Sequence, residues 1–276
     1  MLIAISRELG ACGTEIAVKV ATALGIPLVH HEIADLVSSR WDVPREAVLD
    51  LKTFRPSDLK MFRSRSSAVH GVAYVSSEVL TLAAPGSVVF RGWSAAQLLS
   101  SVPHALCVRI CAPFKLRVER MQERVSQGKA LVKRMVQEND ALRARLVREY
   151  HDCDWRDPEG YDLSINTGRL PVDDAVAQIV AQARAPAFRK SSGSAQIMEN
   201  LRLEALARAT LYRNPATRDV RVHVKVSGDE LIVGGILNDG AQREEVIRVL
   251  SSSALGRSVT SRLRAPTDYR TRTSSI

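Results

Sequence analysis

The chain has 276 residues, of which 45% are hydrophobic and 25% charged, a composition typical of soluble globular proteins and unlike that of collagen, coiled-coil arrays or disordered chains. Its formal net charge of +9 favours an anionic partner, and nucleotide phosphates, nucleic acid and acidic lipid all fit that description. No apolar run has membrane-spanning length and the N-terminus lacks a secretory signal pattern, so a cytoplasmic protein is expected.

Short apolar runs alternate with helical patterns from residue 2 to residue 184. This alternation predicts an α/β fold in which helices wrap a parallel sheet. The expected strands cover residues 2–6, 27–29, 87–91, 105–110 and 161–165. One helix is expected to begin near Gly13. A second is expected over residues 57–83 with Ser57 as its N-cap, and further helical patterns cover residues 113–150 and 172–184.

A second, smaller domain is predicted after a linker. Residues 185–195 are rich in Pro, Ser and Gly, which indicates a flexible connection between a first domain over residues 1–184 and the rest. The patterns that follow predict a helix at 196–211, strands at 220–226 and 231–237, a helix at 242–250 and a strand at 258–263. This α-β-β-α-β order predicts a small α+β domain over residues 196–265, followed by a mobile basic tail at 266–276.

The cysteines and histidines give no metal-site signal. Cys12, Cys107, Cys111 and Cys153 form no CxxC pair and have no neighbouring histidine at ligand spacing, which favours free buried thiols. The adjacent residues His30 and His31 are interpreted as a surface pair at a strand end. No metal-ligating residue is therefore assigned.

The strongest local signal is the turn that joins the first strand to the first helix. It reads Ser6-Arg7-Glu8-Leu9-Gly10-Ala11-Cys12-Gly13-Thr14. Glycines let backbone N–H groups approach an anion closely, and the helix N-terminus adds unpaired donors and the positive end of its dipole. The turn is thus a candidate phosphate site, although an ordinary strand-to-helix connection with two glycines fits the same spacing.

Several segments across about residues 1–183 resemble the cytidylate kinase-like family in order and spacing. They are Ile5-Ser6-Arg7-Glu8, Gly10-Ala11-Cys12-Gly13-Thr14-Glu15-Ile16-Ala17, Leu24-Gly25-Ile26-Pro27, Phe90-Arg91-Gly92, Ala112-Pro113, Asp140 with Arg143, and Tyr161-Asp162-Leu163-Ser164-Ile165-Asn166-Thr167-Gly168-Arg169-Leu170. The resemblance implies a nucleoside monophosphate kinase fold of the P-loop kinase type, with a phosphate loop, a monophosphate-binding region and an arginine-bearing lid. It also implies ATP as donor, nucleotide substrates, and Mg²⁺ bridging the donor phosphates.

The same resemblance assigns roles to individual positions. The residues that would hold the donor triphosphate are Ser6, Arg7, Gly10, Ala11, Cys12, Gly13 and Thr14. Arg91, at the carboxyl end of a strand, would bind the acceptor phosphate. Lid cations that would neutralise the transferring phosphoryl group come from Arg117, Arg120, Arg124, Arg143 and Arg145, of which one or two are expected to reach substrate. Asp140 would either act on the substrate side or pair with Arg143 at i,i+3.

The phosphate loop departs from known patterns at particular positions. Its Walker lysine position carries Gly13, so no lysine reaches the terminal phosphates and Arg7 is the nearest cation. Cys12 replaces a glycine of the family, so a side chain would crowd the phosphate path. These changes leave two functions open, an ATP-dependent phosphotransferase acting on a nucleoside monophosphate and a non-catalytic nucleotide-sensing or scaffold protein.

Residues 205–263 resemble a BON domain, a binding module without a catalytic constellation. The matching features include the Asn214-Pro215-Ala216-Thr217 turn, the Gly228-Asp229 turn and the pair Gly234-Gly235. This resemblance implies a lipid-surface or protein partner that recruits the nucleotide-binding domain. Nucleic acid is not favoured, because only 5% of the residues are aromatic and no aromatic-rich stacking sheet is indicated.

Overall fold

The computed structural model describes residues 1–45, 48, 65–237, 239–253 and 255–265. The expected N-cap Ser57 lies outside these residues, and so does the expected basic tail. Within the described part of the chain, no helix combines the length and the apolar character needed to cross a bilayer.

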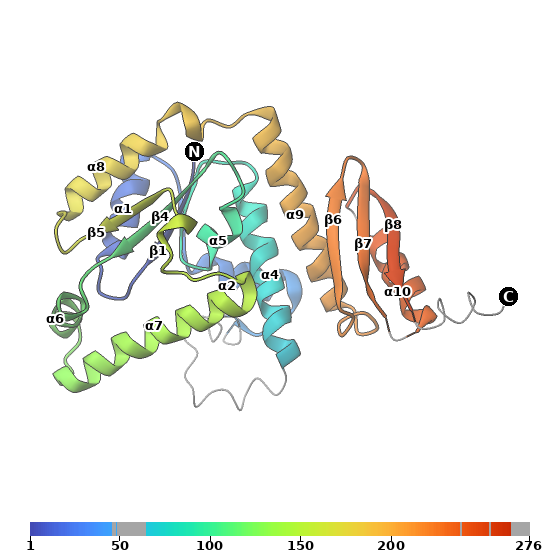
Figure 1. The fold of residues 1–276 in the computed structure, drawn as a ribbon, viewed down its shortest axis with the longest axis horizontal. Helices are drawn as coiled ribbons and strands as arrows, with labels where there is room; N and C mark the ends of the chain where they lie inside the picture. The colour runs from blue at the N-terminus through green and yellow to red at the C-terminus, as the bar shows by residue number, and fades with distance from the viewer. Residues whose placement is uncertain (46–47, 49–64, 238, 254, 266–276) are drawn as a thin grey trace.

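A five-stranded parallel sheet with the order β2-β3-β1-β4-β5 forms the centre of the larger unit (Figure 1). Its strands are β1 (Leu2–Arg7), β2 (Leu28–Val29), β3 (Val88–Arg91), β4 (Ala105–Cys111) and β5 (Leu163–Asn166). The five predicted strands are thereby confirmed, as is the parallel sheet. Because the sheet is parallel, the segment that follows β1 emerges at its carboxyl edge, and because β1 is the central strand this segment lies at the middle of that edge, where open α/β sheets bind ligands.

Helices cover both faces of this sheet. Side chains along β1 point alternately to the two faces, so that β1 contributes to a core on each side. Ile3 and Ile5 point into one core with the helices of one face, while Leu2 and Ala4 point into a second core on the other face. The helices of the first face are α1 (Gly13–Leu24) and α8 (Val172–Ala183), and those of the second are α2 (Glu32–Trp41), α4 (Arg65–Ala83) and α5 (Ala95–Leu99). The expected lid is the pair α6 (Phe114–Arg124) and α7 (Lys129–His151).

A three-stranded sheet forms the small unit near the C-terminus. It consists of β6 (Val222–Ser227), β7 (Glu230–Ile236) and β8 (Ser258–Arg264), with α10 (Gly240–Ser251) in the crossover. Strands β6 and β7 form an antiparallel hairpin, and β8 adds parallel to β7. Together with α9 (Ser192–Arg213), these elements have the predicted α-β-β-α-β order.

The structure corrects the flexible linker expected over residues 185–195. A short 3-10 helix covers Pro186–Phe188, and α9 begins at Ser192 rather than at residue 196. The Ser191 side chain accepts from the Ser194 backbone N–H at 3.2 Å, while the Ser191 N–H donates to Ser194 Oγ at 2.9 Å. The serines that suggested flexibility form a reciprocal cap on a helix, a use of serine that composition alone does not separate from a linker.

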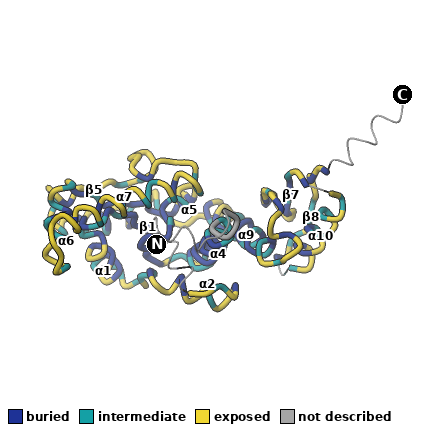
Figure 2. Tube along the Cα trace, turned by 90° about the horizontal axis from the view of Figure 1, so that it is seen from below, coloured by how far each residue is buried: buried dark blue, intermediate teal, exposed yellow. Residues whose placement is uncertain are grey.

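Helix α9 belongs to two cores at once. Met198, Ala205 and Ala209 pack into the larger unit against α4, whereas Leu203 and Leu211 pack into the core of the small sheet. Figure 2 shows α4 and α9 side by side between the two units. The boundary between the units is therefore a shared helix instead of an exposed connection.

Candidate anion-binding site

The loop after β1 has a backbone that glycine makes possible. Gly10 has φ +84°, and a Cβ there would lie 2.5 Å from the carbonyl oxygen of Arg117, so no side chain fits. Cys12 also has a left-handed φ of 59°, which is strained for a non-glycine residue, and it immediately precedes α1. The loop thus packs tightly against α6, and it leads into α1 at Gly13, where the sequence predicted a helix to begin.

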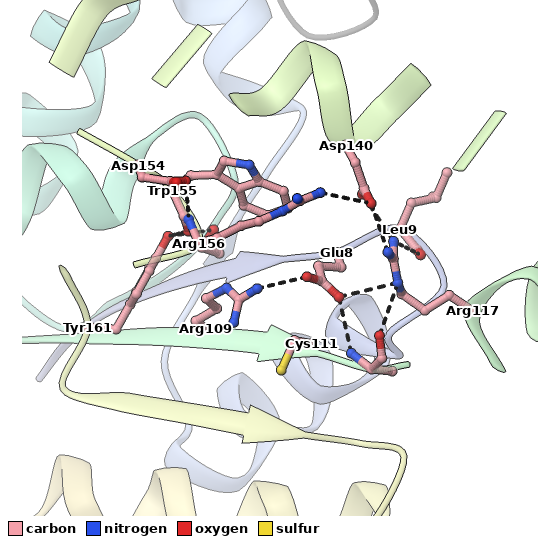
Figure 3. Close-up of polar contacts among 12 residues, drawn as sticks. Glu8, Leu9, Arg109, Cys111, Arg117, Asp140, Asp154, Trp155, Arg156 and Tyr161 are labelled. Carbon is pink, nitrogen blue, oxygen red and sulfur yellow. Dashed lines mark hydrogen bonds and ion pairs between the residues drawn. The ribbon is translucent and has the colours of Figure 1, made fainter. Parts of the chain in front are cut away.

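Glu8 anchors this loop to the neighbouring strand and lid helix, although the sequence analysis gave it no role. The carboxylate is buried, with 7% of the residue exposed. Oε1 accepts from Arg109 Nη2 at 2.8 Å, and Oε2 accepts from the Ala112 N–H at 3.2 Å (Figure 3). Arg117 Nε lies 3.2 Å from Oε2. Glu8 therefore holds the loop against β4 and α6.

Asp140 has a different partner from the one expected. It does not pair with Arg143 among the ion pairs of the described residues. Instead, its carboxylate accepts two hydrogen bonds from Arg117, at 3.0 and 2.8 Å, and one from Arg156 at 3.3 Å (Figure 3). Both oxygens of Asp140 are thus occupied by guanidinium groups, and its ion-pair partner is Arg117 on α6 instead of Arg143 on its own helix.

The other lid arginines are placed in distinct ways. Arg120 donates to Thr167 Oγ1 at 3.0 Å and to the Thr167 carbonyl at 2.8 Å, so it joins α6 to the end of β5. Arg124 and Arg145 are exposed. Of the expected lid cations, the structure brings Arg143 alone to the cluster described next, while Arg117 and Arg120 serve the scaffold.

Three guanidinium groups, from Arg7, Arg91 and Arg143, converge beside α1. Arg91 Nη1 donates to Thr14 Oγ1 at 2.6 Å, and Arg7 Nε donates to the same oxygen at 3.3 Å. No residue in the described part of the chain accepts a hydrogen bond from Arg7 Nη1, Arg91 Nε or Arg143 Nε, although all three atoms are buried. Buried donors without an acceptor are costly, so this cluster is suited to an anion.

The electrostatics of the cluster lead to the same conclusion. Burial lowers the pKa of Arg7 to about 9, and the neighbouring charges of Arg143 and Arg91 contribute in the same direction. The pKa of Arg91 is also lowered, first by burial and then by Arg143, with Glu32 opposing. Burial likewise lowers the pKa of Arg143. Positive charge is thus held at short range in a poorly solvated place, which a bound phosphate would relieve.

Trp155 positions one member of this cluster. Its ring is almost fully buried, with 1% of the residue exposed. The guanidinium carbons of Arg109, Arg143 and Arg156 lie 5.8, 5.3 and 5.5 Å from the ring centroid. An aromatic face attracts cations, so Trp155 links Arg143 to the scaffold around Glu8.

A cavity lies next to the cluster, between the carboxyl end of β1, the β3–α5 connection, α4 and α7. Ser6, Arg7 and Arg143 line one part of it, whereas Val72 and Val75 of α4 form an apolar wall. His151 lines it too, and burial lowers the pKa of His151 to about 4, so that the imidazole is neutral near pH 7. The site therefore combines a cationic cluster with a largely apolar cavity.

A five-stranded parallel sheet wrapped by helices, with the loop after β1 leading into the N-terminus of α1, has the fold of the P-loop kinase class. The chain belongs to the cytidylate kinase-like family, whose model matches residues 2–169. The matched region ends before α8, α9 and the small unit.

Individual relatives agree with this assignment. The chain is similar to a cytidylate kinase of Natronomonas pharaonis, with 27% identity over 191 residues, covering 67% of this chain and 92% of the relative. A cytidylate kinase of Pyrobaculum islandicum is 26% identical over 177 residues, covering 64% and 89%. A solved structure of an uncharacterized protein from Eubacterium ventriosum shares the fold, with a TM-score of 0.52 at 22% identity, covering 66% of this chain and 97% of that one. Membership of this family supports a nucleotide kinase-type function.

Proposed function

We propose that this chain is an ATP-dependent phosphotransferase that acts on a nucleoside monophosphate. The observation that carries the proposal is the cluster of Arg7, Arg91 and Arg143, whose buried donors lack acceptors in the described part of the chain. The cluster lies at the carboxyl edge of a parallel sheet, beside the N-terminus of α1, where phosphate binding is favoured.

The chemistry of this transfer requires positioning and charge neutralisation. A phosphate oxygen of the acceptor attacks the terminal phosphorus of ATP, a P–O bond forms, and the bond from that phosphorus to the bridging oxygen of ADP breaks. Charge on the transferring group would be neutralised by the three guanidinium groups, which are already fixed by Thr14 and Trp155. Backbone N–H groups of residues 10–14 would hold the donor phosphates.

The phosphates of ATP fit this arrangement, and Mg²⁺ does not. Phosphate oxygens are the acceptors that the open guanidinium donors lack. In P-loop proteins the hydroxyl after the loop binds the metal, but Thr14 Oγ1 already accepts from Arg7 and Arg91. The proposed mechanism therefore includes no metal-dependent step.

A second function, nucleotide binding without turnover, is favoured by the loop itself. It has no lysine, and Cys12 carries a side chain at a left-handed φ of 59° where the phosphates would approach. In this alternative, the cluster binds the nucleotide, and the small unit recruits the protein to a partner or a membrane.

One assay separates the two functions. The purified chain is incubated with ATP and each of a panel of nucleoside monophosphates, with and without magnesium, and nucleoside diphosphate formation is measured by chromatography. Turnover that is lost in Arg143→Gln and kept in Arg134→Gln, an exposed arginine of the same helix paired with Glu138, supports the phosphotransferase. ATP binding by calorimetry without turnover for any acceptor supports the alternative.

We also propose that the chain is divided into a cytidylate kinase-like domain over residues 1–184 and a BON-like binding domain over residues 196–265. The element order of the small unit supports this division, with α9 serving both parts. Its outer sheet face carries the exposed residues Lys225 and Arg262 and the side chain of Ile236, which is 78% exposed. Cosedimentation with anionic and neutral vesicles tests a lipid partner, and equal lack of binding to both favours a protein partner.

A further inference from the structure

The hydroxyl of Thr14 is the group that would be expected to bind a metal ion, but its oxygen is not available to one. Thr14 directly follows Gly13 and therefore occupies the Ser/Thr position of the P-loop pattern. In P-loop proteins the hydroxyl at that position binds the metal. Its oxygen has two lone pairs, and both are used by the hydrogen bonds from Arg91 Nη1 at 2.6 Å and Arg7 Nε at 3.3 Å. A cation at this oxygen would have to displace both guanidinium groups.

Two carboxylates that contact the loop or its lid arginine, Glu8 and Asp140, are equally unavailable. Glu8 is held by Arg109, Arg117 and the Ala112 N–H, and both oxygens of Asp140 are held by guanidinium groups. Among the described residues, no group of three or more His, Cys, Asp or Glu side chains could hold a metal ion. Magnesium prefers carboxylate, phosphate and water oxygens, and neither Glu8 nor Asp140 offers it an open carboxylate.

Charge also opposes a divalent cation at this position. The charges of Arg143 and Arg91 lower the pKa of Arg7, the charge of Arg143 lowers the pKa of Arg91, and burial lowers the pKa of all three groups. A further double positive charge would increase this repulsion, whereas a polyphosphate would remove it.

We propose that this site binds the polyphosphate of its nucleotide as the metal-free anion, with Arg7, Arg91 and Arg143 in the place of the divalent cation. The ligand's nucleoside part rests on the proposed function; the metal-free binding of its phosphates rests on the geometry of Thr14 and the three arginines. Free magnesium is then a competitor, because it withdraws the free nucleotide from solution.

Calorimetric titration tests this inference with two probes, ADP and inorganic tripolyphosphate, each in excess EDTA and in excess magnesium chloride. Both probes are expected to bind in EDTA, and magnesium is expected to weaken their apparent affinity severalfold. Binding of either probe that appears only with magnesium overturns the inference and leaves the proposed function intact. Tripolyphosphate binding in EDTA without ADP binding supports the anion site and contradicts the nucleotide function. No binding of either probe in either buffer contradicts both.

A variant pair adds a readout that a purely structural role would not change. Arg91→Gln removes one charge and one donor from Thr14, so the affinity in EDTA is expected to fall roughly tenfold or more, as for loss of a charged hydrogen bond. The freed Thr14 oxygen and the reduced positive charge should also let magnesium increase affinity in this variant. Arg134→Gln, at an exposed pair on α7, should keep the wild-type preference for EDTA. Equal magnesium dependence in wild type and Arg91→Gln, with both folded by circular dichroism, refutes the role of the arginines in excluding the metal.

Discussion

Replacing Asp140 by asparagine removes the charge that orients Arg117 while changing the side-chain shape little. Arg117 is 4% exposed and would keep its contacts with Glu8 and with the carbonyl groups of Leu9 and Ala112, at 3.2, 3.3 and 3.2 Å. Breaking a buried ion pair costs roughly 3–5 kcal/mol, and the remaining acceptors place Asp140→Asn near the lower end, about 3 kcal/mol. In a chain of this size, each kcal/mol of lost stability lowers the melting temperature by about 2–4 °C, so the substitution is expected to lower it by about 6–12 °C.

Thermal unfolding followed by circular dichroism measures this change. Glu138→Gln on the same helix is the matched control, because Glu138 forms an exposed pair with Arg134 and should shift stability by less than about 1 kcal/mol. If the Asp140→Asn protein unfolds within about 1 °C of wild type but loses phosphotransferase activity, the carboxylate acts on substrate and is not needed to hold Arg117.

Three further results are expected. Gly13→Val should weaken ATP binding in calorimetry, since a Cβ at Gly13 would lie 2.6 Å from Arg7 Cβ and displace that side chain; unchanged affinity in a folded variant would place ATP elsewhere. Native His151 binds its proton near pH 4 and the unfolded chain near pH 6.5, so its contribution to stability is complete above about pH 6.5 and is lost as the pH falls toward 4. In His151→Leu the urea midpoint of unfolding should accordingly change less with pH between 4 and 6.5 than in wild type. Equal pH dependence of the midpoint in the two proteins would contradict this. A chain ending at residue 184 should aggregate in size-exclusion chromatography, because without α9 the apolar surface of the larger unit that packs against Met198 and Ala209 is exposed to water. A stable monomer would show that α9 is dispensable.

Local sequence signals were sufficient for the parallel sheet and for the glycine-containing turn from β1 into α1. Each strand of the larger unit is a short apolar run between turn residues, and the loop glycines are adjacent in sequence to the helix they precede. These features depend on neighbours within a few residues, which periodicity and turn chemistry report directly.

The partners of Asp140 were beyond such signals. Its ion pairs join residues 23 and 16 positions away, on α6 and after α7, whereas sequence spacing offered only Arg143 at i,i+3. Trp155 and Glu8 were missed for the same reason, since their roles depend on arginines that the fold assembles from different elements. The linker was misinterpreted because a serine-rich helix cap and a flexible serine-rich segment have the same composition.

Because α9 packs on both sides, it joins the small unit to the wall of the cavity beside Arg7 and Arg143. On one side α9 is fastened to β6, where Glu204 accepts from the Val226 N–H at 3.0 Å, and on the other it lies along α4. Val72 and Val75 of α4 line the cavity. The three-stranded sheet and the cavity wall are therefore joined through two packed helices, and a substitution that loosens the contact between α4 and α9 alters the support of both.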